Sequence, residues 1–403
     1  MRTKFTQLSK VCEVARWGRT KVKLLSIETT PNPNSMKLNV DERLANGVAI
    51  TYTHENTEDC PAYIQKLLAI PGVSSVFRVA DFIAIQRKPT AGWEDILARA
   101  RVVLEYASLN RTKPEPAGVS DKTWREARVS VQYFRGLPML VKVSSGDETI
   151  RLPLPDRFGQ ALERAMGASE NMLMERKWSD EGLRYGELRE VGEVVVHEIS
   201  ASYDEKKLEE MVERAYHPDL PEKVKASREE LGDLVRAFES PKWEERFAAL
   251  KELGRNATAQ IDAQSLSLII RATKDPKMSI RRLAVVLLGL IKSPAVLAPL
   301  CEALRDEAVG VRRSAGDALT DLGDRQAIGP MVETLKDPNK LVRWRAGRFL
   351  YEVGDESALP ALKEAQYDPE FEVAMQIRQA IERIESGKVA QGPVWRQMTQ
   401  GIN

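Results

Sequence analysis

Few side chains in this sequence could carry out chemistry, and their spacing argues against most reactions. The three cysteines, Cys12, Cys60 and Cys301, lie far apart in the chain. An iron–sulfur cluster needs converging thiolates, usually about four per cluster, so we expect this chain to hold none. Three widely spaced cysteines also favour reduced thiols over a disulfide framework, which predicts a cytoplasmic protein.

Two of the three histidines precede a glutamate, as His54-Glu55 and His197-Glu198. His-Glu pairs hold iron in some helical-repeat oxygenases, but there they lie inside helices. We place both pairs on strands, where adjacent side chains point to opposite faces, so we expect no metal site. The sequence also lacks the motifs of dinucleotide sites, P-loops, zinc sites and nucleophile elbows. We therefore predict a protein that is not an enzyme and holds no cofactor.

A group of arginines and one tryptophan offers binding chemistry instead. Arg282 and Arg313 occupy equivalent positions of a repeated pattern, and Trp344, Arg345 and Arg348 fall in the matching turn of the next copy. Arginine and aromatic residues often anchor protein interfaces, so we predict a partner-binding face here. The alternative is pairing with acidic side chains inside the repeats. With 60 Lys and Arg against 59 Asp and Glu, the chain has no net field that favours nucleic acid.

The pattern that positions these arginines recurs every 31 residues in the last third of the chain. Each copy starts with an aspartate, and three copies carry an arginine six residues later. The aspartates are Asp275, Asp306, Asp337 and Asp368, and the arginines are Arg281, Arg312 and Arg343. Self-similarity at a period of about 20–50 residues indicates stacked structural repeats.

Local signals predict that each copy is a helical hairpin. The Asp-Pro step found in three copies favours a helix start, because the carboxylate accepts from free N–H groups and proline suits the first turn. Gly354 is expected to end its helix in the left-handed conformation. A second helix with Leu359 and Leu362 on its apolar face then runs into the next aspartate.

These repeats resemble HEAT repeats of the short type also seen in bilin lyases, over residues 240–388. The resemblance implies a ladder between neighbouring repeats made by the turn aspartate and the arginine six residues later. Its pairs would be Asp275 with Arg281, Asp306 with Arg312 and Asp337 with Arg343. Ala374 replaces the arginine in the last copy, so we expect the ladder to stop there. A divergent first copy is expected to begin at Ser240.

The N-terminal part, residues 24–107, is predicted to form strand, strand, helix, strand, strand and helix. Its distinctive run, expected to be extended and then to turn, consists of Thr30, Pro31, Asn32, Pro33, Asn34 and Ser35. With Ile70–Val73 and Val79–Ile83, this run resembles the N-terminal domain of Nfu/NifU scaffold proteins. Those proteins hold their cluster in a separate domain with Cys-x-x-Cys, which is absent from this sequence. The resemblance implies the domain without the cluster chemistry.

The middle part, from Met139 to Tyr216, is predicted to form the same order of strands and helices, with strands at 171–178 and 193–201 and a last helix capped by Asp204. We expect either a degenerate copy of the first domain or at least the same two-layer architecture. The fold class is therefore an Nfu-type two-layer α/β domain, a second α+β domain and a C-terminal α-solenoid.

The predicted boundaries follow from these patterns and from the polar, proline-rich stretches between them. Residues 1–22 are expected to be a disordered basic extension, with an organellar transit peptide as the alternative. The remaining predicted segments are the Nfu-like domain 23–110, linker 111–122, middle domain 123–217, linker 218–239, repeats 240–388 and tail 389–403, which is expected to cap the last repeat.

Taken together, residues 23 to about 388 resemble the conserved virulence factor C family of Gram-positive bacteria, whose name supplies no activity. The resemblance implies a cytoplasmic bacterial protein. No apolar run approaches the ~18–20 residues that span a bilayer, so we expect no membrane partner. Our first hypothesis is a scaffold that binds a protein partner. The alternatives are an accessory factor in iron–sulfur assembly, which would meet the assembly machinery, and a lyase, whose structural sign would be a buried cluster of ionisable groups.

Overall fold

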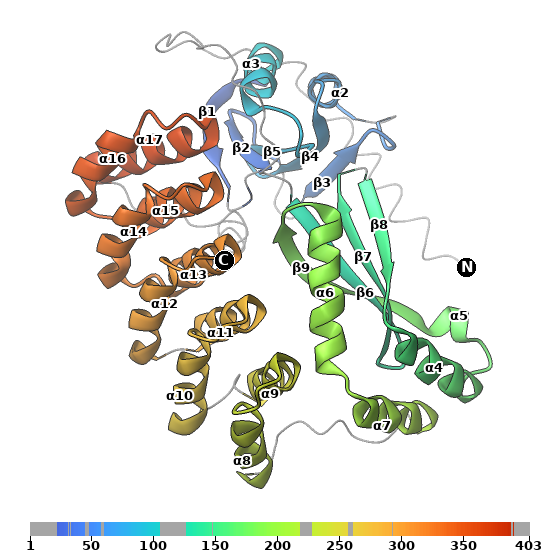
Figure 1. The fold of residues 1–403 in the computed structure, drawn as a ribbon. Coiled ribbons are helices and arrows are strands. Elements are labelled where there is room, and N and C mark those ends of the chain that lie inside the picture. The colour runs from blue at the N-terminus through green and yellow to red at the C-terminus, as the bar shows by residue number, and fades with distance from the viewer. Residues whose placement is uncertain are drawn as a thin grey trace. The chain divides into compact units, whose positions relative to one another are not determined.

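The computed structural model describes eleven segments of the chain, separated by gaps. They are residues 22–30, 32, 34–44, 48–57, 60–104, 126–146, 148–217, 228–256, 261–291, 293–387 and 390. The predicted linker 111–122 lies outside them, as do the basic extension up to residue 21 and the tail apart from residue 390. The elements form two compact units, whose members are labelled in Figure 1. One contains residues 1–124 and 359–403, and the other contains residues 125–358.

The first unit is built on a five-stranded antiparallel sheet with the order β1-β2-β5-β4-β3. The strands are β1 (Leu24–Thr29), β2 (Ser35–Val40), β3 (Ala49–Thr53), β4 (Val73–Val79) and β5 (Phe82–Arg87). Two helices accompany it, α2 (Ala62–Leu68) and α3 (Trp93–Val103). The two-layer α/β prediction is confirmed, but sequence analysis missed β2. The chain does turn at Asn34, but the side chains that bond to the backbone of the turn are those of Thr30 and Asn32. Ser35 already begins β2, which pairs with both β1 and β5.

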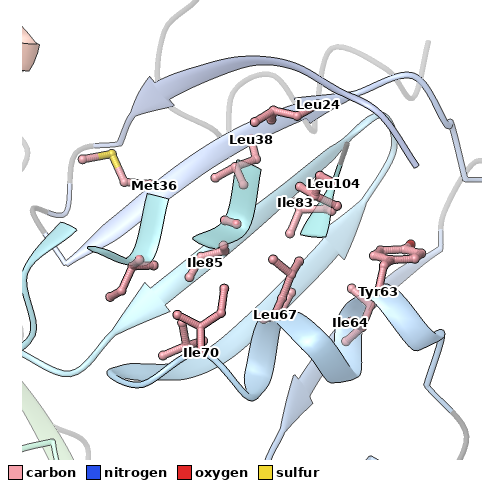
Figure 2. Packing of buried hydrophobic residues seen from close by; sticks show 14 of the residues in the cluster. Leu24, Met36, Leu38, Tyr63, Ile64, Leu67, Ile70, Ile83, Ile85 and Leu104 are labelled. Carbon is pink, nitrogen blue, oxygen red and sulfur yellow. The ribbon is translucent and has the colours of Figure 1, made fainter. Parts of the chain in front are cut away.

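Strands and helices of this unit share one hydrophobic core. Figure 2 shows Leu38 and Ile85 from the sheet facing Ile64 and Leu67 from α2. All four are fully buried, and burial of such a side chain stabilises a fold by roughly 1.5–3 kcal/mol. This core joins the sheet and α2 into one packed domain.

The last hairpin of the chain belongs to the same unit. It consists of α16 (Leu359–Ala365) and α17 (Phe371–Glu385). Phe371 and Met375 of α17 pack against the hydrophobic core of the α/β domain. The Gln379 amide also donates to the Ile27 carbonyl oxygen, 3.1 Å away. The final repeat is therefore an integral part of the N-terminal unit.

The second unit contains a four-stranded antiparallel sheet with the order β8-β7-β6-β9. The strands are β6 (Glu126–Phe134), β7 (Leu137–Ser145), β8 (Glu148–Pro153) and β9 (Arg176–Tyr185). Its helices are α4 (Asp156–Ala165), α5 (Met172–Glu175), α6 (Leu188–Ser202) and α7 (Glu205–Tyr216). Because this strand order differs from that of the first sheet, the expectation of a degenerate copy is wrong. Asp204 does cap α7, as predicted, by accepting from the Lys207 N–H.

The strand predicted at 193–201 is instead part of helix α6. Its short apolar run suggested a strand, but the buried residues Leu188, Val195 and Ile199 recur at helical spacing. Gly192 lies on the same face, and a Cβ placed there would come 2.4 Å from Cδ1 of Leu152. The missing side chain lets α6 pack closely on the sheet.

The repeats of the second unit form alternating helices, as the 31-residue period predicts. They are α8 (Arg228–Ala237), α9 (Trp243–Asn256), α10 (Ala263–Ala272), α11 (Met278–Leu290), α12 (Leu297–Ala303), α13 (Val309–Leu322), α14 (Ile328–Thr334) and α15 (Lys340–Glu352). Short 3₁₀ turns precede α12, α14 and α16: η3 (Pro294–Val296), η4 (Arg325–Ala327) and η5 (Glu356–Ala358). The predicted linker 218–239 is wrong in its second half, because α8 lies there and pairs with α9.

The turn aspartates act slightly earlier than predicted. Asp275 lies three residues before α11, and its Oδ1 accepts from the Lys277 N–H at 2.8 Å. Asp306 and Asp337 repeat this geometry. Gly323 ends α13 in the left-handed conformation with φ 66°. The matching expectation for Gly354 is wrong, since α15 ends through Val353 with φ −119° and ψ −23°.

Candidate functional site

Arginines at adjacent positions of each repeat serve two different purposes, and the first is an inter-repeat ladder. Arg281 donates two hydrogen bonds to the Asp306 carboxylate, from Nε at 2.7 Å and from Nη2 at 3.0 Å. Arg312 grips Asp337 in the same way at 2.6 and 3.0 Å. The carboxylate of Asp306 raises the pKa of Arg281. Bidentate charge-assisted pairs of this kind are the strong class of hydrogen bonds.

The predicted pairs are displaced by one repeat. Arg281 and Arg312 bind the carboxylate of the following repeat. Toward the aspartate of its own repeat, Arg281 donates to the backbone carbonyl oxygen of Asp275 at 3.0 Å. The reason is the turn, in which each carboxylate accepts from the backbone N–H two residues later and so lies toward the preceding repeat. Arg343, the third predicted arginine, donates to the carbonyl oxygen of Asp337 at 2.9 Å.

The ladder also starts one repeat earlier than predicted. Arg246 binds the Asp275 carboxylate at 2.7 and 3.0 Å and donates to the Ser240 carbonyl oxygen. This arginine follows Ser240 by six residues, so the spacing in the divergent first copy was the available signal. The ladder is a structural element of the repeats.

The second set of arginines faces the middle domain, which lies in the same unit. Arg282 of α11 donates through Nη2 to both carboxylate oxygens of Glu198 on α6, at 3.1 and 3.3 Å. Arg184 of β9 donates to the same carboxylate at 3.4 Å. Burial, with Arg282 next in effect, lowers the pKa of Arg184 to about 10. Glu198 is thus a buried acceptor shared by two guanidinium groups.

Two further arginines make cation–π contacts with Tyr185, the last residue of β9. The Cζ atom of Arg313 lies 4.3 Å from the centre of its ring, and that of Arg345 lies 5.7 Å away. Arg345 also forms an ion pair with Asp317, at 2.9 Å between Nε and Oδ1. Burial, with the neighbouring Arg345 second, lowers the pKa of Arg313 to about 10. We call Arg184, Arg282, Arg313 and Arg345 the arginine row.

The remaining two predicted partner-binding residues are also buried. Trp344 is 1% exposed and contributes to the packing of α15. Arg348 forms an ion pair with Glu352 one turn later and lies over the Tyr351 ring. All five residues predicted as a partner-binding face are therefore buried within the chain. Three of them, Arg282, Arg313 and Arg345, contact Glu198 or Tyr185 of the middle domain. Binding of an external protein at these positions stays a prediction.

The His-Glu pairs do not lie on strands, contrary to expectation. His54 lies in the turn after β3, where Nε2 hydrogen-bonds with the Val73 carbonyl oxygen at 3.1 Å. In α6, His197 is exposed and Glu198 is buried. Among the residues that the structure describes, no group of three or more His, Cys, Asp or Glu side chains could hold a metal ion. Burial raises the pKa of the Cys60 and Cys301 thiols.

The Nfu-like run builds a loop in the first unit. Thr30 Oγ1 donates to the carbonyl oxygens of Asn32 and Ser35, at 2.9 and 3.0 Å. Asn34 accepts from Arg87, at the side chain from Nε and at the carbonyl from the backbone N–H. Pro31 and Pro33 lie outside the described residues. The run therefore positions Arg87.

Arg87 connects this loop to the last repeat hairpin. Its Nη1 donates to Glu372 Oε1 of α17 at 2.7 Å and to the Ala91 carbonyl oxygen at 2.8 Å. Its Cζ lies 5.1 Å from the centre of the Trp93 ring. Burial lowers the pKa of Arg87, and the Glu372 carboxylate opposes that shift. Neither Arg87 nor Glu372 was predicted as a site residue, because no local sequence pattern links positions so far apart.

One hollow of about 400 Å³ lies beside the Arg312–Asp337 rung. Cys301, Arg305 and Glu333 contribute to its lining, and the last two form an ion pair. The charges that line it are mixed, which gives it no preference for an anion or a cation. Separately, none of the described helices is both long and apolar enough to cross a membrane.

Comparison with family models assigns all three parts of the chain. The N-terminal model of scaffold protein Nfu/NifU matches residues 25–109, and a model described as virulence factor matches residues 132–212. HEAT repeats match residues 229–320 and 300–382. The start of the HEAT match agrees with the position of α8.

Several solved structures resemble parts of the chain. The crystal structure of protein SAV1430 from Staphylococcus aureus is 37% identical and covers 20% of this chain and 96% of that one, with a TM-score of 0.19. A computationally designed armadillo repeat protein is 16% identical and covers 55% of this chain and 98% of that one, with a TM-score of 0.31.

Relatives match along almost the whole length. The uncharacterized protein YpgR of Bacillus subtilis is 45% identical over 94% of this chain and 98% of its own. Conserved virulence factor C of Staphylococcus haemolyticus is 43% identical over 94% of this chain and 99% of its own, and that of a Staphylococcus aureus strain is 42% identical. The chain therefore belongs to the conserved virulence factor C family.

Proposed function

We propose that this protein is a non-enzymatic scaffold of the bacterial cytoplasm whose repeats bind a protein partner. The observation that carries the proposal is that repeat helices already hold α/β domains in both units. In the first unit Glu372 of α17 binds Arg87, and in the second unit Arg282 of α11 binds Glu198. Stacked helical repeats expose extended surfaces suited to this task.

The composition of the arginine row supports binding rather than catalysis. A buried cluster of ionisable groups was the structural sign expected of a lyase, and such a cluster exists around Glu198. However, it consists mainly of guanidinium groups, which stay protonated and cannot act as general bases. Its buried carboxylate is committed to Arg184 and Arg282. The cluster is suited to holding negative charge rather than to moving protons.

The repeats retain exposed apolar side chains that a partner would cover. Val286 and Leu290 are separated by one turn on α11 and are 39% and 64% exposed. Residues four apart lie on the same face of a helix. They follow Arg282 on that face, so a protein bound there would lie next to the middle domain.

Site-specific crosslinking tests the scaffold directly. A photo-crosslinking amino acid at Leu290 in the full-length chain, expressed in a native host, is expected to capture one defined protein. The same photo-crosslinking amino acid in place of the exposed Glu163 of α4 is the control and should not capture this protein. The captured protein, once purified, should bind the wild-type chain and lose at least about tenfold in affinity, or about 1.4 kcal/mol, with Leu290→Asp. Equal capture at both positions, or turnover of a small molecule by the pure chain, contradicts the proposal.

A second candidate is an accessory role in iron–sulfur assembly, which the Nfu/NifU match over residues 25–109 favours. In that case the N-terminal unit would contact the assembly machinery without holding a cluster. Cluster transfer to an apo-client protein, followed by its visible absorption, should then be faster with the chain than without it. An unchanged transfer rate contradicts this candidate and leaves the scaffold proposal intact.

A further inference from the structure

We propose that the arginine row and Tyr185 form a binding site for a phosphate group, either as the free ion or on a small organic molecule. The site lies entirely within the second unit, between β9 and helices α11, α13 and α15. It does not depend on the external protein partner proposed above.

Arg313 is the residue that points to a ligand. It is 7% exposed, and among the described residues no carboxylate lies within ion-pair distance of its guanidinium group. Its Nε has no hydrogen-bond partner. The Tyr185 ring stabilises the cation from one side, because the ring face carries partial negative charge. A ring face accepts no conventional hydrogen bond, so the donors of Arg313 remain for an anion.

The charges around Arg313 leave a positive surplus. Arg345 is offset by Asp317, and Glu198 offsets one of its two partners, Arg184 and Arg282. The four guanidinium groups of the row against Glu198 and Asp317 leave two more positive than negative charges, and Asp317, whose side chain is 51% exposed, also acts on Arg313. Glu181 and Asp321 also act on the row, but both are exposed, and water and salt screen exposed charges. A dianion would balance this surplus.

The geometry of the donors favours a phosphate over a carboxylate. A planar guanidinium offers parallel N–H donors that match phosphate oxygens in pairs. Arg345 of α15 lies over the same Tyr185 ring as Arg313, and Arg282 of α11 also acts on its charge. A tetrahedral ion can accept hydrogen bonds from more than one direction at once. A carboxylate, which is planar and carries a single charge, would leave part of the surplus uncompensated.

Such a ligand would also join two parts of the second unit. Arg184 and Tyr185 come from the strand β9 of the middle domain, whereas Arg313 and Arg345 come from the repeats. An anion bound between them would add contacts across this internal boundary. It would therefore stabilise the packing of the middle domain on the repeats, because anything that binds only the folded state stabilises it.

Isothermal titration of the full-length protein with inorganic phosphate tests the site. Sodium chloride at matched ionic strength is the reference. We expect saturable binding of one phosphate per chain, weakened at least about tenfold, or about 1.4 kcal/mol, by Arg313→Gln. Arg313→Lys, which keeps the charge but loses the paired N–H donors of the planar guanidinium group, should also weaken phosphate binding. Arg325→Gln removes an exposed arginine that pairs with Asp355 and should leave phosphate binding unchanged.

Two outcomes would overturn the site. One is the absence of saturable binding to the wild-type chain, and the other is equal affinity in Arg313→Gln and wild type. Thermal unfolding guards against a misfolded variant, since phosphate should raise the melting temperature of wild type but not that of Arg313→Gln. Titrations with phosphoserine and with serine distinguish an organic phosphate ester from the free phosphate ion as the ligand. Tighter binding of phosphoserine than of phosphate indicates an organic ester, the reverse indicates the free ion, and equal binding of serine counts against any phosphate site.

Discussion

Arg312 and Arg313 are neighbours in α13 and are almost equally buried, at 9% and 7% exposure, yet their surroundings differ. Arg312 has a carboxylate at 2.6 Å and two backbone carbonyls near 3 Å. Arg313 has an aromatic ring and other cations. Arg281 and Arg282 show a milder form of the same contrast. Equal burial of the same residue type therefore does not imply an equal contribution to stability.

The difference lies in what compensates the buried charge. Removal of a guanidinium group from water costs several kcal/mol, and a bidentate carboxylate with further hydrogen bonds offsets that cost. The ladder provides this compensation from within the repeats, so each rung is complete in itself. The arginine row is compensated mainly by Glu198 and Tyr185 of the middle domain and by the exposed Asp317 of the repeats. The first region has the properties of a structural element, and the second has those of a binding site.

The largest effect is expected from breaking a rung. Arg312→Met leaves the Asp337 carboxylate buried without its cation, and removal of one partner of a buried pair costs about 3–5 kcal/mol. Urea unfolding followed by circular dichroism measures the change. Glu333→Gln, which removes an exposed ion-pair partner from the same repeat, is the control and should stay near wild type. A loss no larger than that of the control would falsify the structural role of the ladder.

A smaller effect is expected at the shared carboxylate of the arginine row. Glu198→Gln keeps an acceptor for Arg282 but removes the charge, and hydrogen bonds to charged groups contribute about 1.5–3 kcal/mol. We expect a loss in this range, together with faster amide hydrogen exchange in α6. His197→Gln changes the exposed neighbour and is the matched control. Unchanged exchange in α6 would show that Glu198 does not hold the middle domain on the repeats.

The sharpest form of the comparison is Arg313→Met against Arg312→Met. Replacement of a poorly compensated buried charge by an apolar side chain of similar length is often neutral or stabilising. In phosphate-free buffer we therefore expect Arg313→Met to lose less than about 1 kcal/mol, or to gain stability. The same urea titration measures it. If the two variants lose equal stability, the distinction between the ladder and the row does not hold.

The sequence predicted those parts of the fold that local patterns encode. The 31-residue period gave the hairpins, their turn aspartates and the ladder arginines, and the Nfu-like run located a loop that does turn at Asn34. The failures came from short segments. The apolar run at 193–201 is compatible with both strand and helix periodicity, and it forms a helix. Helix α8 lies in a charged stretch that was predicted to be a linker. Short runs do not separate the two periods, so packing decides between them.

The site was less predictable than the fold. The positions of Arg282 and Arg313 followed from the repeat, but their partners did not, because Tyr185 and Glu198 lie about 100 residues away on elements that were predicted as strands or not at all. The link from Arg87 to Glu372 spans 285 positions. Contacts of this kind arise only when domains pack, and a single sequence carries no local sign of them.

The smallest effect is expected at an exposed ion pair between neighbouring repeats, Arg325 with Asp355. Asp355 accepts from Arg325 at 2.6 Å and from the N–H and hydroxyl of Ser357. These hydrogen bonds lower the pKa of Asp355 from 3.8 to about 2. A lowered carboxyl pKa stabilises the fold above the unfolded value, and this contribution is lost as the pH falls from about 4 toward 2.

Because this pair is largely exposed, water screens it, and Asp355→Asn should cost less than about 1 kcal/mol at neutral pH. Asparagine keeps the acceptor that Ser357 needs, so the variant isolates the charge. Urea midpoints of wild type and variant, measured from pH 7 to pH 2, should converge as the carboxylate becomes protonated, and 0.5 M salt should reduce the difference between them at pH 7. A cost at neutral pH as large as that of Arg312→Met would mean that burial does not separate the ladder from this exposed pair.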